Sequence, residues 1–175
     1  MQPEFEDFIA KWRVIAMQSG SFELPSRGAI TAGGFAKYLP GMMIAQWDLE
    51  YTFHQIRYVG SQIEAAWRQD PSQQSFSVVF KDSAAAKMHV EIARAVTSKH
   101  IAALVEAELV FDDHLVLPVA QLRLPLAPEG GQPMIMSLFS FPETASGPSA
   151  SMPKLENLRS RFIELIPADK LAAVI

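Results

Sequence analysis

Apolar residues near the amino terminus recur at three- and four-residue intervals, which place them on one face of an α-helix. These residues are Phe5, Phe8, Ile9, Trp12, Ile15 and Ala16. Glycine commonly follows the last turn of a helix, and Gly20 stands where this pattern stops. We therefore predict an amphipathic helix over residues 1–20. A second, short helix is expected between Thr31, a good capping residue, and Leu39–Pro40.

The pattern then changes to a period of two, which is typical of a half-buried strand. Between Met43 and Leu49 every second residue is apolar, and Gln46 and Asp48 occupy two of the positions between. Residues 51–59 continue as a second strand, because they are rich in aromatic and β-branched side chains.

Helical signals return after Gly60. The segment SQIEAAWRQ favours a short helix, and DPSQQS interrupts it. Asp82–Ser83 then caps a longer helix that we expect to extend to about Ser98. The apolar face of this longer helix carries Ala85, Met88, Ile92 and Val96.

Alternation resumes in three consecutive segments, 101–111, 115–126 and 133–141, which short polar turns separate. In the first segment every odd position is apolar, whereas Glu106 and Glu108 point to the other side. Successive strands joined by short turns predict an antiparallel meander.

The end of the chain again shows helical spacing. Residues 142–153 have the composition of a linker. Residues 154–175 follow with an apolar stripe made of Leu155, Leu158, Phe162 and Leu165. We predict an amphipathic helix in this tail. The order of elements predicts an α+β fold, in which residues 21–141 form a core with a five-stranded antiparallel sheet and helices segregated to one face.

Composition narrows the class of protein. The chain has 175 residues, of which 49% are hydrophobic and 19% charged, as in an ordered single domain. A net charge of −4 argues against a dedicated nucleic-acid binder. The absence of cysteine excludes disulfides and thiolate zinc sites. Neither a signal-peptide pattern nor a membrane-length apolar run is present, so we expect a cytoplasmic protein without a membrane partner.

Several short motifs occur in a fixed order along the chain. Trp12 is followed by LPSRGAI, YLPGMMIAQWD, IRYVGS and LRLPL. Over roughly residues 12–140 this series resembles a family of small, stand-alone bacterial PAS-like proteins. The matching positions are Trp12, Pro25, Ser26, Arg27, Leu39, Pro40, Asp48, Arg57, Val59, Gly60 and Ser61. The resemblance implies a PAS domain with two strands, a helical middle and three strands. The chain departs from the family after Ser61, where IEAAWRQDP replaces a frequent threonine-glycine turn.

The positions of the glycines and histidines argue against a phosphate-binding loop and a metal site. No phosphate-binding motif surrounds Gly60, so we expect this glycine to provide an unusual backbone angle at a strand-to-helix corner. The four histidines form no metal-binding pair, and no metal site is predicted. The resemblance offers His89 as a haem ligand, because haem-binding PAS sensors use the equivalent helix. A histidine at the border of the apolar face, without haem, is the favoured interpretation, and the cofactor stays unknown.

Two arginines stand within strand patterns, and either would need an anionic or carbonyl partner if it faced inward. That partner is a ligand carboxylate or a structural salt bridge, and exposure to solvent is the third alternative. Aromatic side chains of the core provide walls for a pocket between sheet and helices. The candidate ligand-binding residues are Arg57, Trp67, His89, Phe111, Arg123 and Phe139.

These patterns together predict a regulatory domain without enzymatic activity. The resemblance implies that the domain senses a small molecule, light or redox state, or mediates protein association. Its output would act through a partner protein or a homodimer formed by the terminal helices. Two alternatives remain. One is a scaffold whose own side chains fill the pocket, and the other is a small enzyme with His54 and Asp48 as an acid–base pair.

Overall fold

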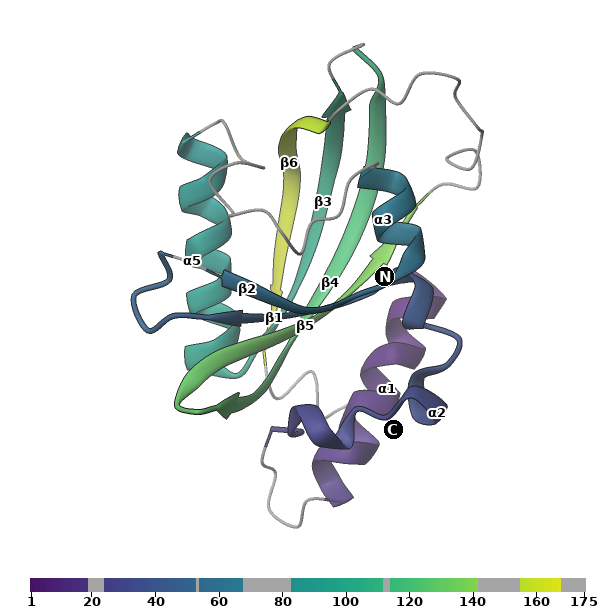
Figure 1. Cartoon of the computed structure of the whole chain (residues 1–175), viewed down its shortest axis with the longest axis vertical. Coiled ribbons are helices and arrows are strands. Elements are labelled where there is room, and N and C mark those ends of the chain that lie inside the picture. Colours follow the sequence, from purple (N-terminus) through teal and green to yellow (C-terminus); the bar gives the residue numbers. More distant parts are fainter. Residues whose placement is uncertain (19–23, 53, 68–82, 112–113, 142–154, 168–175) are drawn as a thin grey trace.

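One antiparallel sheet organises the computed structural model, which describes residues 1–18, 24–52, 54–67, 83–111, 114–141 and 155–167 (Figure 1). In this part of the chain six strands pair in the order β2-β1-β5-β4-β3-β6. They are β1 (Met42–Trp47), β2 (His54–Val59), β3 (Ala102–Phe111), β4 (Val116–Glu129), β5 (Gln132–Ser140) and β6 (Leu155–Ile166). The α-helices are α1 (Pro3–Gln18), α2 (Ala32–Phe35), α3 (Ser61–Trp67) and α5 (Ser83–Lys99), and the short 3-10 turns are η1 (Arg27–Ala29) and η2 (Leu39–Gly41). The α+β prediction is confirmed.

Most predicted elements are present, with shifted ends. Thr31 caps α2 as expected, since its hydroxyl oxygen accepts a hydrogen bond from the Gly34 amide at 3.1 Å. That helix stops at Phe35, earlier than predicted. Strand β1 ends before Leu49, which lies in the β1–β2 turn and is 72% exposed. The predicted break at residues 70–75 and the linker at 142–153 lie outside the described residues.

The predicted helix in the tail is wrong, because Leu155–Ile166 forms strand β6. This strand pairs antiparallel with β3 from Ala102 to Phe111, so the sheet has six strands and not five. Without β6, the backbone N–H and C=O groups on one side of β3 would form a long unpaired edge. Pairing with β3 satisfies these groups, and this tertiary constraint overrides the helical spacing of the tail's apolar residues.

The prediction that helices cover one face is also wrong, because they cover both. Leu122 and Leu124 of β4 share a hydrophobic cluster with Phe8 of α1, which we call the α1-side core. Ile92 of α5 belongs to a second cluster with Val105 of β3, which we call the α5-side core. Successive residues of a strand point to opposite faces, so the two clusters lie on opposite sides of the sheet. Figure 1 shows α5 and α1 well separated on either side of the strands.

Two of the motifs join the amino-terminal segments to β4. The indole Nε1–H of Trp12 donates a buried hydrogen bond to the Pro125 carbonyl oxygen at 2.9 Å. The carbonyl oxygen of Pro25 accepts a hydrogen bond from the Ala127 amide at 2.9 Å. Ser26, which follows Pro25, caps η1 with its hydroxyl group. These residues of the motif therefore hold α1 and the following turn against the sheet.

Gly60 has a different role from the one predicted. Positive φ angles occur at Gly130 and Gly131 in the β4–β5 turn, as expected for a tight hairpin, but Gly60 is not among the described glycines with such an angle. A Cβ atom at position 60 would lie 2.0 Å from the Leu39 carbonyl oxygen and 2.3 Å from that of Pro40. Close approach of two backbone segments, and not an unusual angle, requires glycine here.

We expect Gly60→Ala to lower the free energy of unfolding by about 3 kcal/mol or more, because backbone atoms cannot move away as a flexible side chain would. Gly33→Ala is the matched control. It lies in α2 with no atom within 4 Å of the added Cβ, and we expect a change within about 1 kcal/mol in the stabilising direction. Urea unfolding followed by circular dichroism measures both. Equal stability of the two variants would contradict the packing role of Gly60.

Candidate functional site

A buried arginine lies at the centre of the sheet. Arg123 is in β4, and its neighbours Leu122 and Leu124 face the α1-side core. Alternation along the strand therefore directs Arg123 to the opposite face, toward α5. Its side chain is 7% exposed. Its partners in the sheet are the small residues Ala103 of β3 and Ser137 of β5, which leave space beside the long arginine side chain.

Hydrogen bonds to neighbouring side chains occupy some of the N–H donors of the guanidinium group. Its Nε and Nη2 atoms donate to the side-chain oxygen Oε1 of Gln121 at 3.0 and 2.8 Å. The Nη2 atom also donates a short hydrogen bond to Nδ1 of His89, which is 1% exposed on α5. Because Nδ1 accepts, a neutral His89 carries its proton on Nε2. The described residues accept no hydrogen bond from Nη1 of Arg123.

The electrostatics leave a positive charge inside the protein. Burial lowers the pKa of Arg123 to about 10, so the guanidinium remains protonated at neutral pH. Burial, and secondly the charge of Arg123, lower the pKa of His89 well below its usual value and that of His54 to about 4. Both imidazoles are therefore neutral at pH 7.

No acidic side chain among the described residues forms an ion pair with Arg123. The ion pairs in this part of the chain are Lys37 with Asp7 and Arg27 with Glu129, and all four side chains are solvent-exposed. A buried charge normally has an oppositely charged partner, because transfer from water costs several kcal/mol. As far as the structure describes the chain, Arg123 therefore differs from a residue in an ordinary structural salt bridge.

A small cavity adjoins this group. Its volume is about 40 Å³, which is room for only a few water molecules. Its lining combines apolar side chains with neutral polar side chains and one cation. The lining residues are Met43, Ala45, Trp47, His54, Gln121, Arg123, Ile135 and Ser137.

The structure brings some of the predicted site residues together and separates others. Arg123 and His89 are in direct contact. Trp67 and Phe139 pack edge to face in the α5-side core, with ring centroids 6.2 Å apart, and Phe111 is fully buried in the same core. These three aromatic residues belong to the α5-side core and are not among the residues that line the cavity. The buried Trp67 indole N–H has no hydrogen-bond partner among the described residues.

Arg57 is not part of this cluster. Its side chain is exposed on β2 and donates to Gln55 at 3.0 Å, so the solvent alternative holds for it. Sequence reasoning missed Gln121 and Ser137. The period of two could have found Gln121, because residues 121 and 123 of one strand share a face. Ser137 lies beside Arg123 only through the pairing of β4 with β5, which no local pattern reveals.

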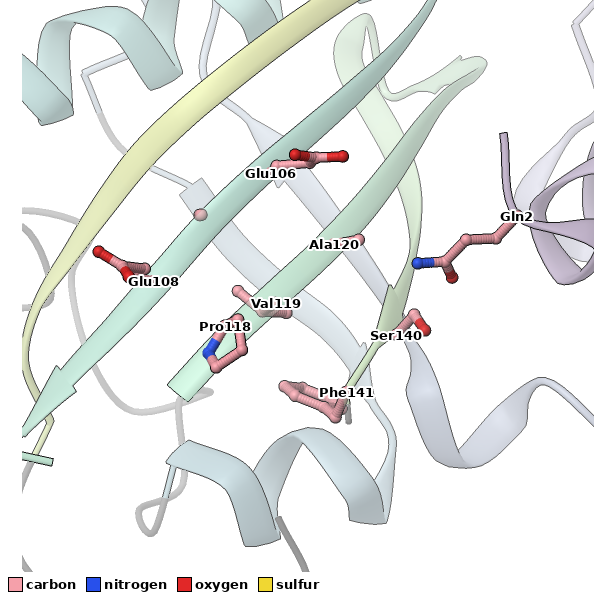
Figure 2. Close-up of a pocket in the computed structure, with 9 residues that line it drawn as sticks. Gln2, Glu106, Glu108, Pro118, Val119, Ala120, Ser140 and Phe141 are labelled. Atoms are coloured by element: carbon pink, nitrogen blue, oxygen red, sulfur yellow. The ribbon is translucent and has the colours of Figure 1, made fainter. Parts of the chain in front are cut away.

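A second, larger hollow lies on the α1 side of the sheet. Its volume is about 360 Å³, and it opens beyond the amino-terminal end of α1 (Figure 2). Gln2 approaches it from one side, and Glu106, Glu108 and Ala120 come from β3 and β4. The two glutamates lie on the same side, as their spacing predicts. The hollow is open to solvent and Glu106 is exposed, whereas Arg123 is buried.

Other chemistry finds no support within the described ranges. They hold no group of three or more His, Cys, Asp or Glu side chains arranged for a metal ion. They also contain no helix long and apolar enough to cross a membrane. The carboxylate of Asp48, proposed as a partner of His54 in an enzyme, accepts hydrogen bonds from the amide and hydroxyl groups of Thr52 in the β1–β2 turn.

Comparison of the chain with protein-family models, with curated proteins and with solved structures finds no match.

The neutral state of His54 predicts acid sensitivity. Its pKa is about 4 in the folded protein and about 6.5 in the unfolded chain, so the unfolded state binds more protons between these values. The stabilisation is complete above pH 6.5 and is lost as the pH falls toward 4. Between pH 7 and pH 5 we expect His54 to account for a loss of about 2 kcal/mol in the free energy of unfolding.

Denaturant unfolding at several pH values tests this. His54→Asn should flatten the pH dependence between pH 7 and pH 5, whereas His114→Asn, at an exposed position, should leave it as in the original chain. Buried His89 contributes in the same direction, so some acid sensitivity persists in His54→Asn. If the stability of His54→Asn depends on pH as that of the original chain does, the folded protein does not keep His54 neutral.

Proposed function

We propose that this chain is a non-enzymatic, PAS-like sensory domain that binds a small molecule between its sheet and α5 and signals through protein association. The observation that carries the proposal is the buried Arg123 side chain beside a cavity, without an acidic partner among the described residues. A buried cation of this kind is more readily explained by a binding site than by stability, because it costs free energy until a ligand accompanies it.

The order of elements along the chain supports the PAS-like part of the proposal. Strands β1 and β2 come first, α3 and α5 follow, and strands β3, β4 and β5 complete the series. This is the order that the motif resemblance implies. The cavity lies on the sheet face that α5 covers, which is the place expected for a ligand in such a fold. Strand β6 is an addition to that series.

A ligand that binds Arg123 would affect α5 through a side chain that contacts both. His89 on α5 accepts a hydrogen bond from the same guanidinium group that borders the cavity. Two further contacts join α5 to the β1–β2 turn, namely Tyr51 with the Thr97 hydroxyl and Arg94 with the Glu50 carbonyl oxygen. Binding that reorients the guanidinium would therefore shift the packing of α5 on the sheet, which is a population shift between two arrangements.

The association surface is proposed on α1. Val14 and Met17 of this helix are 53% and 52% exposed, although the opposite side of the helix is buried in the α1-side core. Exposed apolar residues on an otherwise docked helix are suited to a partner protein or a second copy of the chain. The tail is no longer a helical candidate for this role, because it is strand β6.

The scaffold alternative has one observation in its favour. The cavity of about 40 Å³ is far smaller than the roughly 300 Å³ or more of most ligand pockets, so the side chains of the core nearly fill the space. A scaffold would keep the Arg123 charge paired with a solvent anion or solvated by water, and it would not change on addition of small molecules.

Native mass spectrometry of the full chain separates these functions. We expect a retained mass above that of the polypeptide, and we expect Arg123→Gln to lose it. Arg57→Gln removes the same charge at an exposed site and serves as the matched control, so it should retain the ligand. A bare polypeptide for the original chain, with no thermal stabilisation by a pool of small metabolites, would favour the scaffold.

A further inference from the structure

We propose that the ligand of this site is a small monoanion, a short-chain carboxylate, which binds through Nη1 of Arg123. This inference rests on the proposed function, since it names the chemical class of the molecule that the domain binds. It follows from three properties of the site, namely its charge, its free hydrogen-bond donors and its size.

The charge of the site requires an anion. Arg123 contributes one buried positive charge. Within the described ranges its polar contacts are Gln121 and His89, neutral groups that accept hydrogen bonds and bring no negative charge. The cavity lining contains no aspartate or glutamate among the described residues. One negative charge neutralises this site, whereas a cation would be repelled and a neutral ligand would leave the charge uncompensated.

The donors that remain define where the anion binds. Gln121 occupies the Nε and Nη2 side of the guanidinium, and His89 occupies a further Nη2 hydrogen. The two N–H groups of Nη1 have no acceptor among the described residues. A carboxylate oxygen is the acceptor that a guanidinium binds most strongly, because the hydrogen bond joins opposite charges. The hydroxyl group of Ser137, the neighbour of Arg123 in β5, is a further donor at the cavity wall.

The size and polarity of the cavity limit the rest of the molecule. About 40 Å³ is too small to enclose a nucleotide or an aromatic ligand, and suits a carboxylate of about two to four carbon atoms. The lining also contains the apolar side chains of Met43, Ala45 and Ile135, on strands next to the polar groups. An alkyl group would contact these side chains and gain from leaving water. A second carboxylate would have no cation to pair with in this lining, which favours a monoanion over a dicarboxylate.

Calorimetry and thermal unfolding of the full chain test the inference, with acetate and propionate as the probes. Acetamide serves as the neutral isostere, and sodium chloride at matched concentration controls for ionic strength. We expect saturable binding and a raised melting temperature with the two carboxylates, and no saturable effect of acetamide. Arg123→Lys, which keeps the charge but lacks the guanidinium fork, should weaken binding about tenfold or more. Arg57→Gln should bind as the original chain does.

The outcomes are distinct. Equal binding of acetate and acetamide, or undiminished carboxylate binding in Arg123→Lys, overturns the inference. If mass spectrometry finds a retained neutral molecule that acetate does not displace, the inference fails and the proposed function stands. If neither a retained molecule nor carboxylate binding is found, both fail. The comparison of acetate with acetamide in the original chain tests the preference for a carboxylate even if a variant does not fold.

Discussion

The central strands of this sheet are buried on both faces, and the other features of the molecule depend on this constraint. The α1-side core and the α5-side core cover opposite surfaces of β4 and β5. A strand covered on one face can direct its polar residues to solvent, but a strand covered on both faces cannot. The leucines at 122 and 124 of β4 fill one core, so the arginine between them must enter the other.

That position determines the surroundings of the Arg123 guanidinium group. In the low-polarity interior, its charge acts on nearby groups more strongly than a surface charge would. Burial keeps the neighbouring imidazoles neutral, and the charge of Arg123 is the second cause. The hydrogen bond to His89 links a strand to a helix across the site. In the proposed function, an anion that binds Arg123 would act on α5 through this shared hydrogen bond.

Because helices cover both faces, backbone segments and side chains pack closely at the margins of the sheet. The corner at Gly60 brings its backbone against the carbonyl oxygens of residues 39 and 40, where no side chain fits. The indole of Trp12 reaches the backbone of β4 at Pro125 and holds α1 in place. On the far edge, β6 completes the hydrogen bonding of β3. Several motif residues therefore maintain the architecture around the site and do not contact the cavity.

Local pattern was sufficient for much of this protein. Alternation in β3 and the helical spacing of α1 and α5 predict those elements, because each has a buried face whose period appears in the chain. The sequence pattern predicts that Arg123 lies in a strand, but the direction of its side chain depends on which face each helix covers. The tail has the spacing of a helix and forms a strand, because the unpaired edge of β3 lies next to it only in the folded chain. Local periodicity thus determined the type of most elements, whereas tertiary contacts decided the sixth strand and the contact of Arg123 with His89. These contacts join residues far apart in the sequence, and no local spacing encodes them.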